Sequence, residues 1–243
     1  MKETDYIIIS NVALNSAIYE MRLKGDTGAL SRSGQFIDVA VTGKYLRRPI
    51  SVCDYDEKGL TIVYKVVGEG TAALSRMRPG ESVNALCGLG NGFDDGAAAK
   101  KIALVGGGVG LPPLYGLAKR LKEKGAVFSV LAGFNSAADM YYTDNFRALC
   151  GDVRIATADG SFGTKGFVTS LLGKGEFDYF YACGPEPMLE ALLKTGLDGQ
   201  LSYEARMACG FGVCMGCSCK TRLGYKRICK DGPVLEKKEI LWK

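Results

Sequence analysis

Four cysteines near the C-terminal end constrain the fold of this chain more than any other feature of its sequence. Cys209, Cys214 and Cys217 form a C-x4-C-x2-C run, and eleven residues separate Cys217 from Cys229. This spacing is typical of plant-type [2Fe-2S] ferredoxins. Thiolates are the soft anionic ligands that iron favours, and the intervening glycines let the backbone fold tightly around a buried cluster. The pattern therefore predicts that these four cysteines are the metal ligands of a [2Fe-2S] centre.

Two other uses of the cysteines stay open at this point. Structural zinc sites also use four thiolates, but they usually pair their ligands in two short knuckles, and here Cys229 stands alone. A disulfide framework is disfavoured because nine cysteines is an odd number and no secretory signal precedes them. Cys219, which lies beside the triplet, is expected to be a spare small residue, since four ligands already complete the set.

The composition is that of a globular protein, with 47% hydrophobic and 23% charged residues in a chain of 243. Acidic residues stand near the N-terminus where a signal peptide would carry basic ones. The longest stretch with few charges, residues 102–118, is interrupted by glycines and two prolines. We therefore expect no export, no membrane segment and a cytoplasmic location.

The positive charge of the chain is concentrated at its C-terminal end. The net charge is +5, and residues 220–243 carry eight Lys or Arg against three Asp or Glu. This basic segment lacks interleaved aromatics and helix-turn-helix or finger signatures, so we expect no nucleic-acid partner and a role in offsetting the charge of a thiolate-ligated cluster. The chain contains no histidine, so any reaction that it catalyses proceeds without imidazole.

Three regions follow one another along the chain. Residues 1–97 alternate short β-prone runs with turn clusters, which favours a small antiparallel barrel. Residues 98–200 alternate strands with helices, which favours a parallel sheet with covering helices. Residues 201–243 are too glycine-rich to bury much core, so the metal would replace apolar packing there. The predicted strands are 6–10, 17–23, 36–42, 60–67, 101–105, 126–132, 153–157 and 177–183, and the predicted helices are 114–125, 137–149 and 186–194.

Two turns in the second region lie where parallel strands end, which is where open α/β sheets bind ligands. The segment Gly106-Gly107-Gly108-Val109-Gly110 follows a strand and opens a helix, so backbone N–H groups would face a phosphate. It departs from G-x-G-x-x-G at Leu111, and a tight turn without a ligand stays an alternative. The second turn is CGPEPM, residues 183–188, which could also be a proline-started helix. Together the two turns favour one shared ligand cleft.

The first region carries a candidate anion site in the segment Arg47-Arg48-Pro49-Ile50-Ser51. A guanidinium suits a diphosphate, and Gly70-Thr71 supplies a second turn with free backbone N–H groups. Taken alone, this segment could equally be a surface edge strand without a function.

Taken in order along the chain, these motifs resemble the electron-transfer subunits of type B dihydroorotate dehydrogenase, a family in the ferredoxin reductase-like superfamily. The most specific matches are MACGFGVCMGCSCK followed by ICKDGPV. SGQF before RRPIS, GGGVG, CGPEPM and GLGNGF at the domain junction add to them, so the resemblance spans essentially the whole chain. It implies a flavin-binding barrel (residues 1–97), an NAD-binding α/β domain (98–200) and a [2Fe-2S] region (201–243).

The resemblance also implies which residues bind each cofactor. Arg48 would meet the FAD diphosphate, Ser51 would lie near the isoalloxazine ring, and Cys183 would lie close to the nicotinamide. The FAD segments are Arg48, Pro49, Ile50 and Ser51; Val63, Tyr64 and Lys65; and Gly70 with Thr71. The NAD segments are Gly106, Gly107, Gly108 and Gly110; and Cys183, Gly184, Pro185 and Met188.

The activity implied by the resemblance is electron transfer to NAD+ in pyrimidine biosynthesis. A partner subunit with FMN would oxidise dihydroorotate, and the electrons would pass through the [2Fe-2S] cluster and FAD to NAD+, in a heterotetramer of two of each chain. The base that removes a carbon-bound proton from dihydroorotate should lie in that partner. NAD is expected rather than NADP, because residues 133–139 offer no Arg or Lys for a 2′-phosphate.

Two alternatives stay open, one a related oxidoreductase subunit and one from a different class. The flavin and iron-sulfur subunits of NAD(P)H-dependent ferredoxin or sulfide oxidoreductases resemble the chain in domain order, but their first cluster ligand is typically aspartate, where this chain has Cys209. A redox sensor with a labile cluster would not turn over NADH with an artificial acceptor.

Overall fold

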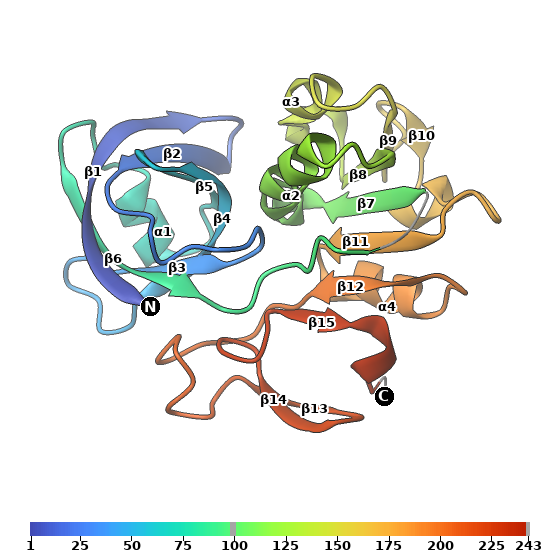
Figure 1. Ribbon diagram of the computed structural model, residues 1–243. Coiled ribbons are helices and arrows are strands. Elements are labelled where there is room, and N and C mark those ends of the chain that lie inside the picture. The colour runs from blue at the N-terminus through green and yellow to red at the C-terminus, as the bar shows by residue number, and fades with distance from the viewer. Residues whose placement is uncertain (98–100, 242–243) are drawn as a thin grey trace.

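The first domain is a closed antiparallel barrel. A computed structural model describes residues 1–97 and 101–241, and its first six strands close in the order β1-β2-β5-β4-β3-β6. Figure 1 shows this barrel, in blue to cyan, beside the rest of the chain. Its strands are β1 (Lys2–Ala13), β2 (Ile18–Lys24), β3 (Phe36–Val39), β4 (Arg48–Asp56), β5 (Gly59–Lys65) and β6 (Ser82–Leu89).

Alternating apolar side chains fill the barrel interior. Ile37 and Ile62 are fully buried, and Leu74 of the short helix α1 (Glu69–Leu74) joins the same core. The predicted barrel is therefore confirmed. The predicted strands included neither β4 nor β6, and α1 was not predicted. Gly70 and Thr71, which were expected in a turn, lie within α1.

The second domain is a seven-stranded sheet in the order β10-β9-β8-β7-β11-β12-β15, parallel except for the last pair. Its strands are β7 (Ile102–Gly107), β8 (Phe128–Phe134), β9 (Val153–Thr157), β10 (Thr164–Lys165), β11 (Tyr179–Cys183), β12 (Asp198–Ser202) and β15 (Val234–Glu236). Its helices are α2 (Pro112–Glu123), α3 (Thr143–Arg147) and α4 (Glu186–Leu193), with 3-10 turns η1 (Gly108–Gly110), η2 (Ala137–Asp139), η3 (Val168–Leu171) and η4 (Lys237–Glu239). The predicted α/β class is confirmed.

The central strand and the first long helix follow directly from their sequences. Every residue of β7 is buried, as expected for a strand covered on both faces. Helix α2 begins with two prolines, which suit the first helical turn, and buries Leu114, Leu117 and Leu121 at helical spacing.

The helix predicted over 137–149 is wrong. The chain forms η2 and α3 instead, because Met140 is extended and Tyr142 has a left-handed backbone with φ of 63°. Ser136 and Asp139 also exchange hydrogen bonds that close the first turn at Asp139.

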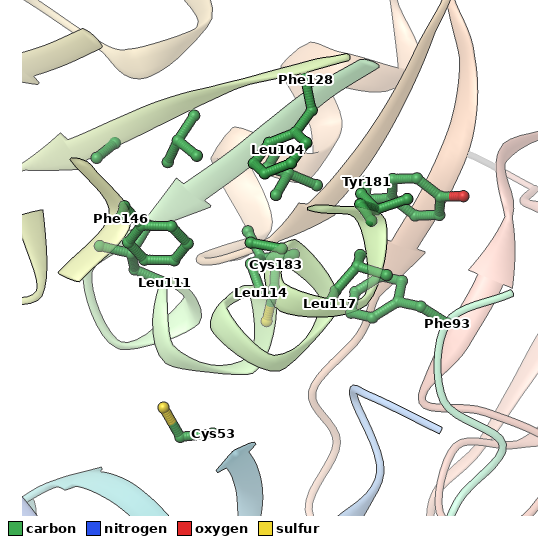
Figure 2. Packing of buried hydrophobic residues seen from close by; sticks show 14 of the residues in the cluster. Cys53, Phe93, Leu104, Leu111, Leu114, Leu117, Phe128, Phe146, Tyr181 and Cys183 are labelled. Atoms are coloured by element: carbon green, nitrogen blue, oxygen red, sulfur yellow. The ribbon is translucent and has the colours of Figure 1, made fainter. Parts of the chain in front are cut away.

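The barrel and the sheet share one apolar core. Figure 2 shows Leu114 and Leu117 of α2 between β7 and the barrel, with Cys53 of β4 on the barrel side. A Cβ at Gly116 would lie 2.9 Å from the Cys53 carbonyl oxygen, so glycine permits this close packing. Lys119 adds an ion pair of 2.6 Å to Asp54 of β4.

The C-terminal region packs against both domains. It contains the hairpin β13 (Ser218–Thr221) and β14 (Gly224–Arg227), and it returns to the large sheet through β15. Asn91 at the domain junction donates to the Val234 carbonyl oxygen at 2.7 Å and accepts from the Val234 N–H at 3.1 Å. Residues 201–243 are therefore held in place by contacts with the other two regions. The domain boundaries at 97/98 and 200/201 stay a prediction. Within residues 1–97 and 101–241, no helix is long and apolar enough to cross a membrane.

Candidate functional site

The four predicted ligand cysteines are gathered as two pairs in the C-terminal region. The Sγ atoms of Cys217 and Cys229 lie 3.2 Å apart, and the Cys229 N–H donates to the Cys217 Sγ at 3.4 Å. Cys209 and Cys214 interact through their side chains in the neighbouring loop. Burial raises the pKa of the Cys229 thiol to about 12, and the neighbouring charges of Cys217 and Cys209 add to that rise.

Backbone N–H groups surround these sulfurs. The Val213 N–H donates to the Cys209 Sγ at 3.3 Å, and the Gly216 N–H donates to the Cys214 Sγ at 3.5 Å. Burial would raise the pKa of the Cys209 thiol, but such backbone donors and its Cys214 neighbour hold that pKa at about 6. The loop therefore stabilises thiolate, the form that binds metal.

This arrangement fits a binuclear cluster. A single zinc ion needs four ligands converging on one point. Two thiolate pairs match the needs of a [2Fe-2S] core, in which each iron takes two protein ligands. Cys219 lies on β13, opposite Lys226 of β14, and burial raises the pKa of its thiol.

A first groove on the barrel joins two of the predicted FAD segments. The Arg48 guanidinium lies directly over Gly70, where an added Cβ would be 2.2 Å from Arg48 Nε. Arg48 and residues 67–71 line a cavity of about 270 Å³. The Thr71 hydroxyl is used within the turn, since it accepts from the Val67 N–H at 3.0 Å. Gly70 therefore makes room for a guanidinium that can face an anion.

A second, larger cavity of about 910 Å³ shares Arg48 with the first. It lies between the loop before β4 and the segment that leads to the cluster cysteines. Four cations line it, which suits a ligand with negative charge. Sequence reasoning missed most of this lining, although three of its members, Ala205, Arg206 and Met207, stand shortly before Cys209. The lining residues are Gly43, Lys44, Tyr45, Leu46, Arg47, Arg48, Pro49, Ala205, Arg206 and Met207.

The side chains of the other predicted FAD residues point to different faces of their strands, because successive residues of a strand alternate between its two faces. Ile50 and Tyr64 point into the barrel core, and the Tyr64 hydroxyl donates to Asn11 Oδ1 at 3.0 Å. Val63 packs into the core shared with the second domain. Ser51 is half-buried and Lys65 is exposed. The side chains of Ile50, Val63 and Tyr64 are thus occupied by packing, and any contact that these residues make to a ligand would use their backbone.

The two predicted NAD segments touch one another at the carboxyl ends of β7 and β11. Gly106 and Cys183 are register partners in these neighbouring parallel strands. A Cβ at Gly110 would lie 2.2 Å from the Cys183 carbonyl oxygen, and a Cβ at Gly107 would lie 2.8 Å from Met188 Sδ. Gly184 is equally constrained, because its Cβ would lie 3.1 Å from the Gly107 nitrogen.

The open side of this junction offers backbone groups to a ligand. Gly108 has φ of 51°, and a Cβ there would meet nothing within 4 Å. Cys183 is buried, and burial raises the pKa of its thiol to about 12, so the thiol is neutral at physiological pH. The strand order reverses between β7 and β11, which is the location where open α/β sheets bind ligands.

A buried carboxylate that sequence reasoning missed lies between the barrel and the cluster loop. Asp38 on β3 is 2% exposed, and its Oδ1 has no hydrogen-bond partner among the described residues. Its Oδ2 lies 2.4 Å from where a Cβ of Gly210 would stand, and Gly210 has φ of 75°. Burial raises the pKa of Asp38 to about 6, although Arg47 and Arg48 oppose that rise.

Asp38→Asn should stabilise the protein at alkaline pH. Because the pKa of Asp38 is higher in the folded state than in the unfolded one, its cost to stability grows as pH rises through about 4 to 6 and is complete above that. We expect the variant to gain about 1–3 kcal/mol in free energy of unfolding at pH 8 and less at pH 5. Denaturant unfolding of the cofactor-loaded protein measures this, with exposed Asp144→Asn as the control; an equal gain at both pH values would contradict it.

Comparisons with known proteins agree with one another. Residues 204–241 match the model of the iron-sulfur cluster binding domain of dihydroorotate dehydrogenase B. The dihydroorotate dehydrogenase B (NAD(+)) electron transfer subunit of Bacillus pumilus is 42% identical over 99% of this chain and 98% of its own length. The subunit of the same name from Fusobacterium nucleatum is 41% identical over 96% of both chains.

Solved structures share the fold. A chain of an NADH-dependent reduced ferredoxin-NADP oxidoreductase, studied for flavin-based electron bifurcation, superposes with a TM-score of 0.87 at 28% identity, covering 98% of this chain and 90% of its own. Phthalate dioxygenase reductase superposes with a TM-score of 0.65 at 20% identity, covering 84% of this chain and 69% of its own.

Proposed function

The chain belongs to the family of dihydroorotate dehydrogenase B (NAD(+)) electron transfer subunits, and from that premise we propose how its residues divide the work. It is an oxidoreductase subunit that passes electrons from a dihydroorotate dehydrogenase catalytic subunit through a [2Fe-2S] cluster and FAD to NAD+. The single observation that carries this function is identity of 42% along nearly the whole length of a relative with that name. An FMN in the partner, a heterotetramer of two of each chain and a cytoplasmic location are further parts of the proposal.

The barrel groove is proposed to hold FAD. Arg48, which lines both cavities, would bind the diphosphate, with Gly70 and Thr71 beside it. Ser51, at the half-buried face of β4, would lie near the isoalloxazine ring. FAD, when bound, supplies the exchange between two-electron and one-electron chemistry.

The junction of β7 and β11 is proposed to hold NAD. Gly106, Gly107, Gly108 and Gly110 would present backbone N–H groups to the phosphates, while Cys183, Gly184, Pro185 and Met188 would form the facing wall. The neutral, buried thiol of Cys183 would lie beside the nicotinamide without offering a charge. Transfer between the flavin and nicotinamide rings depends on orientation rather than on an acid or base, which suits a chain without histidine.

The cluster is proposed to be held by Cys209, Cys214, Cys217 and Cys229. Dihydroorotate oxidation needs a base for a carbon-bound proton. The carboxylates of these two segments, Glu69 of the groove and Glu186 of the CGPEPM turn, are exposed, so we assign that base to the partner subunit.

The flavin and iron-sulfur subunit of an NAD(P)H-dependent ferredoxin oxidoreductase is the second candidate. The solved relative of that kind favours it on fold, with a TM-score of 0.87. Its identity of 28% is nevertheless well below the 42% of the dihydroorotate dehydrogenase relative, so the first function is the better supported.

We expect the protein to use NADH much better than NADPH. Residues 133–139, at the end of β8 and in the turn after it, provide no Arg or Lys to meet a 2′-phosphate, and Asp139 would repel it. The test is reduction of an artificial dye by the cofactor-loaded chain with each nucleotide in turn. Comparable kcat/KM for the two would contradict NAD selectivity, and no turnover with either would contradict the oxidoreductase function.

Arg48→Ala should weaken FAD retention and leave the cluster intact. Loss of one charge-assisted contact costs about 1.5–3 kcal/mol, or roughly ten- to a hundredfold in affinity. Flavin content after gel filtration at micromolar concentration measures the loss, and iron content reports on the cluster. Arg147→Ala, which removes an exposed arginine of α3, is the control. Equal flavin content in both variants would show that Arg48 does not hold the diphosphate.

A further inference from the structure

We infer that Tyr141 and Tyr142 form a strut that fixes the glycine turn of the NAD site against the FAD barrel. The two residues are adjacent in the chain, yet their hydroxyls bind partners in different domains. The inference rests on the proposed function, because it concerns how the two nucleotide sites are held relative to one another. It makes both tyrosines positioning residues for electron exchange between flavin and nicotinamide.

Tyr141 supports the glycine turn. Its hydroxyl donates to the Gly108 carbonyl oxygen at 2.8 Å, and its ring is 7% exposed and packs edge-on against Phe134 at the end of β8. Gly108 is the residue of the turn with a left-handed backbone and open space beside it. The Tyr141 hydroxyl therefore fixes the orientation of the peptide that would face the nucleotide.

Tyr142 reaches into the barrel. Its hydroxyl donates to Glu20 Oε2 at 2.5 Å, although 122 residues separate the two in sequence. Glu20 lies on β2 and is 8% exposed, and its other oxygen accepts from Arg22 Nε at 3.0 Å. Burial raises the pKa of Tyr142, so the hydroxyl stays protonated and donates. A second bond of the same loop, from Asn15 Nδ2 to the Asp139 carbonyl oxygen at 3.2 Å, joins the same two domains.

The backbone between the two tyrosines is strained. Tyr142 has φ of 63°, a conformation unfavourable for a bulky side chain, and among the described residues only Met215 of the cluster loop is another non-glycine with positive φ. A strained backbone conformation persists where surrounding contacts hold it in place, and such conformations are common at functional sites. Here it turns two successive side chains towards opposite domains.

The first experiment replaces each hydroxyl in the cofactor-loaded protein. We expect Tyr142→Phe to slow flavin reduction by saturating NADH about tenfold or more in stopped-flow absorbance, because small misplacements of reacting groups cost large factors in rate. FAD and iron content should equal those of wild type. Tyr115→Phe is the matched control: its ring packs 5.4 Å from that of Tyr142, but its hydroxyl makes no hydrogen bond to another described residue. A rate for Tyr142→Phe equal to those of wild type and Tyr115→Phe would overturn the strut.

Hydrogen–deuterium exchange gives a readout that does not depend on activity. Tyr141→Phe should speed amide exchange in residues 106–111, and Tyr142→Phe should speed it in residues 137–147 and in β2, whereas Tyr115→Phe should leave these segments unchanged. Unchanged exchange in all three variants would overturn the inference. If the flavin of the wild-type protein were not reduced by NADH, the proposed function would fail. Hydrogen–deuterium exchange would still test whether the two tyrosines hold these segments in place.

The barrel side of this hydrogen bond supplies a second test. Glu20→Gln keeps a carbonyl oxygen that can accept from Tyr142, so its rate should stay near that of wild type, whereas Glu20→Leu should slow flavin reduction as much as Tyr142→Phe. Combining Tyr142→Phe with Glu20→Leu should slow the reaction no further, because both remove one bond. Multiplicative effects in the double variant, or equal rates for Glu20→Gln and Glu20→Leu, would overturn the pairing.

Discussion

Serine at any one of Cys209, Cys214, Cys217 or Cys229 is expected to abolish or alter the electron paramagnetic resonance signal of the reduced protein. A [2Fe-2S] core takes four thiolates, and a serine hydroxyl is a harder, less acidic ligand. Within one pair, the Cys217 and Cys229 sulfurs lie 3.2 Å apart, so losing one member would leave an iron with one protein ligand. Iron content should fall together with the signal.

Cys219→Ser is the matched control for the four ligand variants. It makes the same change of sulfur to oxygen two residues from Cys217, on a strand whose register places it opposite Lys226. Its signal and iron content should equal those of wild type. A loss in Cys219→Ser as large as at the other four positions would show that the ligand set is wrong.

The structure agrees with the sequence-based predictions for elements that are determined by a local pattern of residues. The β7 strand, the proline-started helix α2 and the cysteine spacing each depend on neighbouring residues, and the predicted three-part architecture is confirmed. The helix predicted over 137–149 failed because apolar spacing alone carries no sign of the tertiary contacts at Tyr142. Its hydroxyl bond to Glu20 depends on a strand far away in sequence, and no window of the chain contains both.

The same reason explains what was missed at the candidate site. The larger cavity combines the loop before β4 with Arg206 and Met207, which are more than a hundred and fifty residues further along the chain. Asp38 looked like an ordinary polar residue of a strand, and only the fold reveals that the cluster loop covers it. A sequence motif can identify residues that touch a cofactor, whereas residues that hold two motifs together become visible only in three dimensions.

The surface around the cluster bears on where the catalytic subunit binds. Phe211, Val213 and Met215 of the cluster loop are 37%, 73% and 52% exposed, which is unusual for large apolar side chains close to one another in sequence. Lys220 and Arg222 follow them in the chain and are exposed, whereas Lys226 of the same basic segment is paired with Glu239. An electron must pass between cofactors of the two subunits, so we expect this face at or near the subunit contact and an association that slows with added salt.

The purified chain, alone, should oxidise NADH with dyes and yet be inert towards dihydroorotate. We assign to it a flavin groove, a glycine junction and a thiolate site but no base for a substrate carbon, and it contains no histidine. Addition of the catalytic subunit should restore orotate formation linked to NAD+ reduction, which absorbance at the NADH band measures.

The cluster variants are the sharpest control within this assay. Cys209→Ser should keep some NADH-to-dye activity through FAD and lose dihydroorotate-driven NAD+ reduction, because electrons from the partner must cross the cluster first. Clear dihydroorotate-driven reduction of NAD+ by the single chain would instead place the substrate chemistry within this protein and overturn the division between the two subunits.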